Sequence, residues 1–430
     1  MGHDRVSRGV AVLVSATLVV AAAAMASQAL ALAGDGSFYL LRNIATGEVF
    51  GTEQRYFGNL VRQAPALVGV ELGATDTRLL SALFGAGHLV IPALIWSLAI
   101  FLARDDRVVF AGVVGVSGLC AGTTWFFSVS EGVLAMPLTV LLGLLLWREP
   151  SWRWRHAALA VGASAVLVAT YESALVTGLF LAAWAAWRAA RVQPPLERWS
   201  CAIVAALSAL SAVVAVRGAI DPISPKHSRS LLYFVVSLEP WPLYLAIVGL
   251  ALFVAGLGPW LPRRARWAAL CTGTAGLAVA TASLEVSAAA AFAARGGAAI
   301  AVLALLGLLW LDWWRRPTAP PAPDGRLLAV PVLFVLAILT VNAWALRDWS
   351  QSFDTFQSRV DAARGPVSAD DVIPPDRRDV LWSWTVPTLS LLVRSSPDAG
   401  VLYLEQDGGY VPFSPRDARK QIDDAYVWGR

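Results

Sequence analysis

Charged residues are scarce in this chain: they make up 15% of its 430 residues, against 57% hydrophobic residues. Soluble domains carry about 25% charged residues, so the composition excludes an ordinary water-soluble protein. Cysteine and histidine are also rare, with three and four copies. The histidines lack zinc-motif spacing, so no metal site and no cofactor are predicted; a divalent cation is compatible with the chain but not indicated. The cysteines fall inside apolar runs and are predicted to be packing residues rather than a disulfide framework: Cys120, Cys201 and Cys271.

The hydrophobic residues come in runs long enough to cross a hydrocarbon core of ~30 Å as helices, and they lack the alternation of a membrane barrel. We therefore predict an all-α polytopic membrane protein with about eleven transmembrane helices. The first run ends in small residues, so a cleavable signal peptide stays an alternative to a retained anchor. The runs are 10–33, 79–103, 108–126, 133–147, 157–170, 174–187, 202–216, 243–257, 267–284, 298–313 and 327–344.

Loops rich in arginine alternate with loops that are not, beginning with the segment before the first run. Cytoplasmic loops collect Lys and Arg, so the N-terminus is predicted to be cytoplasmic and the C-terminus outside. Topology also explains the net charge of +4, and no nucleic-acid partner is predicted. The chain then divides into a transmembrane domain, 1–346, with outer loops 35–78 and 217–241, and an extracytoplasmic C-terminal segment, 347–430. This segment is predicted to be a small α+β unit with a hairpin of 401–404 and 410–413.

Asp35 follows the first run directly, which places a carboxylate at the outer membrane surface. In that position a carboxylate serves as a general base towards an acceptor hydroxyl or amine when burial and neighbours tune its pKa. A structural alternative stays open, in which Asp35 accepts amide hydrogen bonds as the N-cap of a helix continuing through Leu41 and Ile44.

The order of motifs over about the first 190 residues resembles the GT-C superfamily of polytopic membrane glycosyltransferases. The matching elements are Asp35-x-x-x-Tyr39, Gly47, Gln54-Arg55-Tyr56-Phe57-Gly58-Asn59-Leu60, Ala64-Pro65 and Leu79-Leu80-Ser81-Ala82-Leu83-Phe84-Gly85. The resemblance implies a lipid-linked sugar donor and a catalytic or substrate-positioning role for Asp35. Many members carry two adjacent acidic residues, whereas Gly36 follows Asp35 here, which puts metal dependence and the exact role of Asp35 in question.

Two further carboxylates lie between paired apolar runs, Glu131 in Ser128–Gly132 and Glu172 in Thr170–Ser173. Ionisable groups at membrane depth are costly unless they are paired or hydrated, so a functional role is the default hypothesis. Glu131 is the second catalytic candidate and Glu172 a substrate-binding candidate. The alternative is that both mark solvated turns between helices.

Cations near the outer headgroup level are the candidates for binding a polyprenyl phosphate, because Arg binds phosphate oxygens in a bidentate way. The alternative is contact with lipid headgroups. With Tyr39 of the Asp-x-x-x-Tyr pattern, the substrate-binding candidates are Arg55, Arg62, Lys226, His227 and Arg229.

The predicted function is transfer of a sugar from a polyprenyl-phosphate donor to a glycan, lipid or protein acceptor at the extracytoplasmic face of a bacterial inner (cytoplasmic) membrane. Its partners would be membrane lipids, this donor and this acceptor. A transporter or flippase for a glycolipid or polar solute, in which Glu131 and Glu172 gate a polar path, is the alternative. Polar residues in broken, mid-membrane spans would favour it. A non-catalytic scaffold is the third class.

Overall fold

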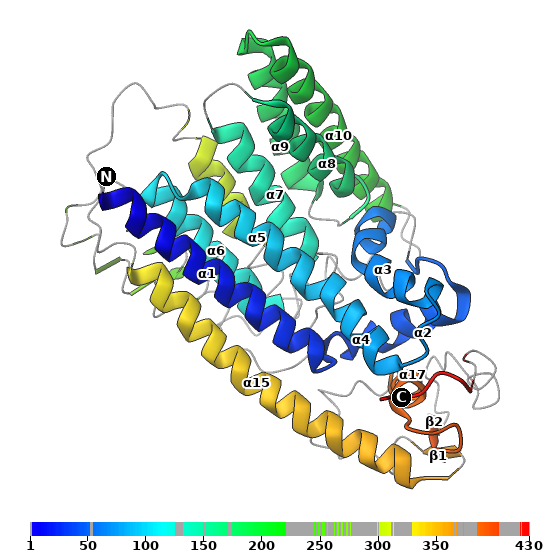
Figure 1. Cartoon of the computed structure of the whole chain (residues 1–430). Coiled ribbons are helices and arrows are strands. Elements are labelled where there is room, and N and C mark those ends of the chain that lie inside the picture. The colour runs from blue at the N-terminus through cyan, green and yellow to red at the C-terminus, as the bar shows by residue number, and fades with distance from the viewer. Residues whose placement is uncertain are drawn as a thin grey trace.

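The computed structural model describes residues 2–51, 55–124, 132–148, 152–170, 174–220, 301–310, 329–364, 366–368, 385–403 and 424–429, with single positions between 245 and 313 and at 373 and 422. Over these residues the chain is helical apart from two three-residue strands. Figure 1 shows long, roughly parallel helices with a set of shorter elements gathered at one end.

The first helix, α1, covers Gly2–Ser27 and is followed by a short 3-10 turn, η1, at Leu30–Leu32. The outer loop then folds into two helices, α2 (Gly36–Thr46) and α3 (Tyr56–Glu71). Gly47 ends α2 with a φ of +67°, a left-handed conformation that glycine adopts without a steric penalty. The predicted helix after Asp35 is therefore confirmed.

The second apolar run forms one continuous helix with a single irregularity. It comprises α4 (Thr77–Gly85), a π-helical turn η3 (Ala86–Val90) and α5 (Ile91–Ala103). Asp76 caps its start, because its side chain accepts a hydrogen bond of 2.8 Å from the amide of Arg78. The following helices are α6 (Arg107–Thr124), α7 (Gly132–Trp147), α8 (Trp154–Leu167), α9 (Ala174–Arg191) and α10 (Pro195–Ile220).

The last long helix, α15 (Ala329–Ala362), has 34 residues and measures about 51 Å at 1.5 Å per residue. It extends well beyond the predicted end of the final run at residue 344, so the proposed boundary at 346/347 falls inside a helix. The chain continues through β1 (Pro366–Ser368), α17 (Val386–Val393) and β2 (Val401–Tyr403).

Strand β2 has a described partner that the sequence analysis did not predict. Strand β2 pairs in parallel with β1, with Val367 opposite Leu402. Parallel strands need a crossover rather than a tight turn, and α17 lies in that connection. The other predicted hairpin strand, 410–413, lies outside the described residues.

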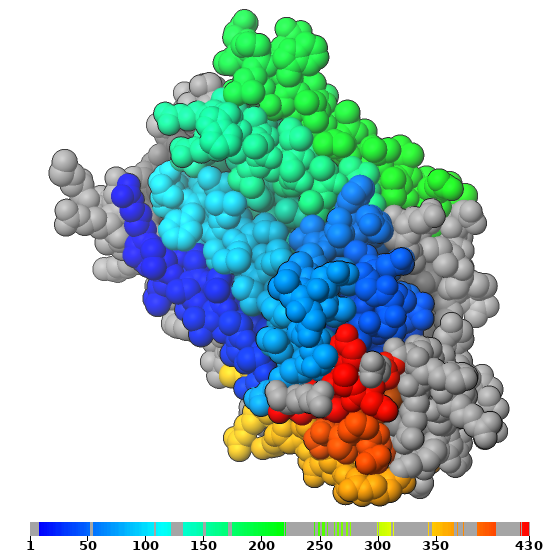
Figure 2. Space-filling view, turned by 45° about the vertical axis from the view of Figure 1, so that its right-hand side comes forward, coloured from blue at the N-terminus to red at the C-terminus, as the bar shows by residue number. Residues whose placement is uncertain are grey.

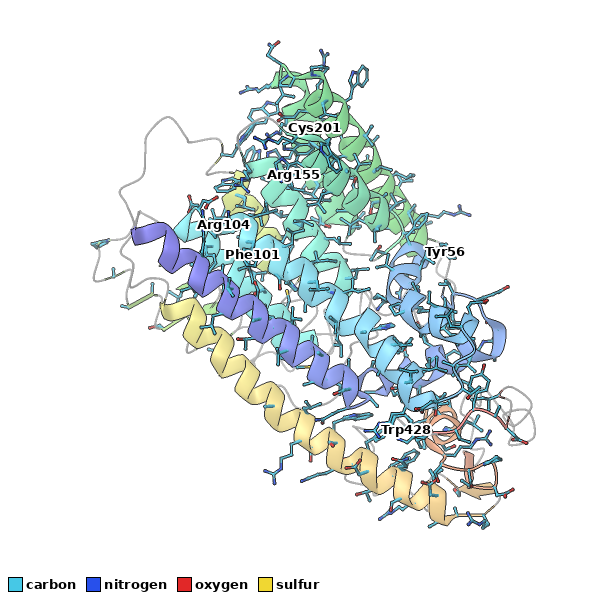
Figure 3. The ribbon with its side chains drawn as sticks, in the orientation of Figure 1. Tyr56, Phe101, Arg104, Arg155, Cys201 and Trp428 are labelled. Carbon is cyan, nitrogen blue, oxygen red and sulfur yellow. The ribbon has the colours of Figure 1, made fainter. Side chains whose placement is uncertain are left out.

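In the part of the chain that the structure describes, three helices are long and apolar enough to cross a membrane: Arg8–Ser27, Thr77–Ala103 and Pro195–Gly218. Shorter apolar helices cover Val109–Ala121, Gly132–Trp147 and Ala301–Trp310. Figure 3 places Arg104 and Arg155 toward one end of this bundle and Tyr56 and Trp428 toward the opposite end. The basic connections at Arg104 and Arg155 and the elements that carry Tyr56 and Trp428 are thus at opposite ends of the helices (Figure 3).

The apolar side chains form two clusters. One fills the bundle between α1, α5, α6, α7, α8 and α9. The other lies where the end of α1 meets α2, α4, the second half of α15 and α17. Figure 2 shows the C-terminal segment, in orange and red, against the blue segment that contains α2 to α4. The C-terminal segment is therefore part of the same packed unit as the first outer loop.

Candidate functional site

Asp35 is half-buried at the residue that precedes α2. Its backbone carbonyl accepts the Tyr39 amide at 3.0 Å, which starts the helix. Its side chain makes no capping hydrogen bond to α2, and its Oδ1 is shielded from solvent. The capping alternative for this carboxylate is therefore not realised, unlike at Asp76, where the carboxylate does cap a helix.

The N-terminal end of α17 lies directly beside this point. The hydroxyl of Ser37 lies 2.9 Å from the hydroxyl of Thr388 and donates to the carbonyl of Thr385 at 3.3 Å. All three residues are buried. Two residues beyond Asp35, the first outer loop and the C-terminal segment are thus joined by hydrogen bonds across more than 340 positions of sequence.

Tyr39 packs in a small aromatic cluster rather than standing alone at the surface. Its ring centroid is 5.1 Å from that of Phe50, and Phe38 lies at the same distance from Phe50 in an edge-on arrangement. The guanidinium of Arg42 lies 5.6 Å from the Phe50 ring centroid, within cation–π range. The cluster fixes the loop between α2 and α3 over the face of α2 that carries Tyr39.

Gln63 holds the same loop from the side of α3. Its Oε1 accepts from Asn43 Nδ2 at 2.7 Å and from the Phe50 amide at 2.8 Å, and its Nε2 donates to the Phe50 carbonyl at 2.6 Å. Gln63 and Asn43 are fully buried. The 35–78 region, predicted as a polar outer loop, is therefore a folded layer with its own polar core.

The two predicted cations of this layer differ in their exposure. Arg55 is partly exposed at the residue before α3. Arg62 is fully buried, so it is not the surface cation that the sequence suggested. Its Nε donates to the Gly58 carbonyl at 3.3 Å and its terminal nitrogen donates to Asn59 Oδ1 at 2.5 Å. The reason is that α3 folds back against η3, where a Cβ on Gly87 would overlap the Arg62 carbonyl oxygen.

The sequence predicted no metal-binding role for His88 and did not indicate it as a site residue. It is a buried polar residue of this region. It is fully buried in the π-helical turn, its Nδ1 lies 2.9 Å from the Phe84 carbonyl, and its ring lies 4.0 Å from that of Phe84. Arg62 is close enough to interact with it electrostatically. The signal in the sequence was a histidine that directly follows Gly85-Ala86-Gly87 inside an apolar run. Small residues of this kind accommodate a π-turn, and π-turns are frequent at functional sites.

The remaining predicted site residues lie outside the described residues: Glu131, Glu172, Lys226, His227 and Arg229. One described contact bears on the position of Glu172. Thr170 packs against Gly58, and the Gly58 amide donates to the Ala169 carbonyl at 3.2 Å. The chain two residues before Glu172 is therefore held at the start of α3.

Among the described residues, no group of three or more His, Cys, Asp and Glu side chains is arranged to hold a metal ion. Cys120 and Cys201 are buried in the first apolar cluster, as the prediction of packing residues expected. No family model, curated protein or solved structure matches the chain. Membership of the glycosyltransferase superfamily therefore stays a prediction from the sequence motifs.

The opposite end of the bundle holds a buried ion pair that stabilises the structure away from Asp35. Arg188 on α9 contacts Glu197 on α10 at 2.6 Å, and both side chains are nearly inaccessible to solvent. Arg188 also donates to the carbonyls of Leu146 and Arg148 at the end of α7. Arginines in this region were predicted to mark a cytoplasmic loop, but Arg188 joins three helices.

Proposed function

We propose that the chain is an eleven-span membrane glycosyltransferase with its N-terminus in the cytoplasm, which transfers a sugar from a polyprenyl-phosphate donor at the outer face of a bacterial inner membrane. The apolar helices support residence in a membrane. The opposite placement of the basic connections and the α2–α3 layer supports the orientation. The motif order that resembles the GT-C superfamily supplies the reaction class.

The position of Asp35 is the observation that carries the proposal. Asp35 lies between the first apolar helix and α2. Its side chain is half-buried and makes no capping hydrogen bond to α2. Partial removal from water and a fixed backbone are the conditions under which a carboxylate is tuned for proton abstraction. In the proposed displacement, Asp35 takes the proton of the acceptor hydroxyl or amine while the acceptor attacks the anomeric carbon and the prenyl phosphate departs.

The departing phosphate needs positive charge near the same face. Arg55 is partly exposed at the start of α3 and is the described candidate for this role. Lys226, His227 and Arg229 are the further candidates from the sequence. Glu131 and Glu172 complete the proposed set, as a second acid–base group and an acceptor-binding group.

The test compares two aspartates of the same outer layer in cells that lack the native protein. Asp35→Asn should lower sugar transfer by roughly 10²- to 10⁴-fold, the range for loss of a general base. Asp76→Asn is the matched control and should retain transfer, because asparagine also caps a helix. Mass spectrometry of envelope glycans provides the readout. A fully active, correctly inserted Asp35→Asn protein would contradict the mechanism.

A second candidate function is a transporter or flippase, and one observation favours it. The apolar helix Thr77–Ala103 is interrupted near its middle by the π-turn, where buried His88 and Arg62 meet. Buried polar residues at an interrupted span are typical of substrate paths. The two functions differ in the knockout: loss of a sugar from mature glycans supports transfer, whereas a stranded lipid-linked precursor with unchanged sugars supports transport.

A further inference from the structure

The imidazole of His88 has a defined hydrogen-bonding state. Its Nδ1 lies 2.9 Å from the Phe84 carbonyl, which only accepts, so Nδ1 carries the proton. The lone pair of a neutral imidazole is then on Nε2. Nε2 is buried, and no group among the described residues lies within hydrogen-bonding distance of it. His88 thus presents an acceptor that requires an O–H or N–H donor.

Two more buried polar groups on the α3–α4 hairpin share this condition. Nδ2 of Asn59 and Oγ of Ser81 have no hydrogen-bond partner in the part of the chain that the structure describes. Asn59 uses its Oδ1 to hold Arg62, which lies beside His88. Buried polar atoms in native proteins are almost always paired. Asn59 Nδ2 is directed at Gly51 and Ser81 lies two turns before His88, so the place for a polar occupant is at His88 itself.

The backbone at this point differs from that of an ordinary apolar helix. The π-turn Ala86–Val90 adds one residue to the helical turn, and Gly87 allows the chain to contact the Arg62 carbonyl oxygen. π-turns are rare and are frequently found at functional sites. A contrast within the same helix is Ser97, whose hydroxyl donates to the Ala93 carbonyl at 2.8 Å as a serine in an apolar helix ordinarily does.

We propose that His88 Nε2 is the acceptor of a binding site for a hydroxyl-bearing polar ligand, in which a ligand hydroxyl donates to Nε2. The site is separate from the Asp35 carboxylate at the start of α2. A sugar hydroxyl and the hydroxyl of a protonated phosphate share this chemistry. The choice of a prenyl phosphate as the probe rests on the proposed function, but the site itself rests on the unpaired Nε2 and the π-turn that holds His88.

The experiment observes His88 by ¹⁵N NMR in lipid nanodiscs. The chain has four histidines, so the His88 resonances are assigned by difference from the spectrum of the His88→Phe variant. The protein is measured alone, with farnesyl phosphate, and with farnesyl phosphate that carries glucose. We expect a protonated Nδ1 and an unprotonated Nε2 in the protein alone, and a change of the Nε2 resonance on hydrogen bonding when probe is added.

The arms separate the source of the hydroxyl. A response to the glycosylated probe alone assigns a sugar hydroxyl, and a response to farnesyl phosphate alone assigns the phosphate hydroxyl, because the glycosylated phosphodiester carries no P–OH at neutral pH. An Nε2 resonance that is the same in all three samples would overturn the proposal, because either no donor or only water then occupies the site. A proton on Nε2 in the protein alone would overturn it as well.

Two variants and one control complete the test. His88→Phe keeps a ring of similar shape against Phe84 and should weaken probe binding roughly 5-fold, the factor for one neutral hydrogen bond. Its melting temperature without probe should be unchanged or higher, because an acceptor without a donor is removed. Ser97→Ala removes a satisfied hydroxyl and should leave binding unchanged. Asp35→Asn should retain the Nε2 response, so failure of the transferase proposal and failure of this site are distinguishable.

Discussion

Replacing Arg188 by leucine is expected to remove the strongest polar contact between α7, α9 and α10. The guanidinium donates to Glu197 Oε1 from Nε at 2.9 Å and from a terminal nitrogen at 2.6 Å, and to the carbonyls of Leu146 and Arg148. The other oxygen of Glu197 accepts the Trp152 amide at 3.0 Å. The variant therefore leaves a buried carboxylate without its cation and two helix-end carbonyls without this donor.

The magnitude follows from these contacts. Breaking a buried ion pair by removing one partner costs about 3–5 kcal/mol. Each lost carbonyl hydrogen bond adds about 1 kcal/mol, but neighbouring losses do not add fully. We expect Arg188→Leu to lower the free energy of unfolding by about 5 kcal/mol. The double variant with Glu197→Leu should lose only about 3 kcal/mol. A buried pair replaced by apolar side chains is often neutral, but the two carbonyl contacts and the acceptor of the Trp152 amide remain lost.

The assay is unfolding of the purified protein in mixed micelles, followed by tryptophan fluorescence. Arg191→Leu is the matched control, because its guanidinium lies 4.1 Å from the Trp187 ring centroid at an exposed position. Its loss should be about 0.5–1 kcal/mol, the range of an exposed cation–π contact. The reasoning is refuted if Arg188→Leu costs no more than Arg191→Leu, or if the double variant is less stable than Arg188→Leu alone.

Two further predictions concern close packing and pH. Gly87→Ala should destabilise the protein by about 1–3 kcal/mol because the added methyl group meets the Arg62 carbonyl, whereas Gly162→Ala, with open space around its Cα, should be neutral or slightly stabilising in the same unfolding assay. The pKa of His156 at the start of α8 lies below its ordinary value of 6.5, first because of burial and then because of the charge of Arg155. Because the pKa is lower in the folded state, this contribution to stability is present above pH 6.5 and is lost as pH falls through the folded-state pKa. The melting temperature should therefore decrease on acidification. His156→Gln removes the titrating group and should reduce that decrease.

The lengths of the apolar runs, and the charged or Pro/Gly-rich residues at their ends, were enough to predict the long helices described above. The run predicted at 79–103 is the helix Thr77–Ala103, and the helix expected after Asp35 is α2. These features depend on local composition, because a helix satisfies its own backbone groups wherever an apolar run is long enough. The number of spans is a finer statement, and it remains part of the proposal.

Contacts between distant segments could not be read in the same way. Arg62 looked like a loop cation because nothing in the neighbouring residues reveals that α3 folds back on η3. The parallel pairing of β2 with β1 joins strands that are separated in the sequence by α17, and no local signal indicates it. Both features are set by tertiary packing, which local turn and charge patterns do not reveal.

The sequence indicated where candidate site residues lie along the chain, but not which distant segments pack beside them. Asp35 could be selected from its place after the first run, but the hydrogen bonds that join Ser37, two residues later, to Thr385 and Thr388 cross more than 340 positions of sequence. His88 carried no motif, since its significance comes from the unfilled acceptor and the π-turn. A sequence pattern locates residue types, whereas burial and missing partners emerge only when the helices are packed.

The dependence of the Asp35 region on the C-terminal segment leads to a last prediction. Phe353 on α15 packs against Trp428 with ring centroids 5.3 Å apart, and the Trp428 amide donates to the carbonyl of Arg394 at 2.9 Å, directly after α17. Phe353→Ala removes a buried aromatic ring, which costs about 3–5 kcal/mol.

This loss should extend along the contacts to α17 and increase amide hydrogen exchange there as well as in the second half of α15. Gln351→Ala, at an exposed position on the same helix, is the control and should leave both unchanged. If exchange rises in α15 while α17 keeps its protection, the C-terminal segment folds independently of α15. The second apolar cluster would then not be the element that positions α17 beside Asp35, and the support for a preorganised site at that carboxylate would have to come from α2 and α3 alone.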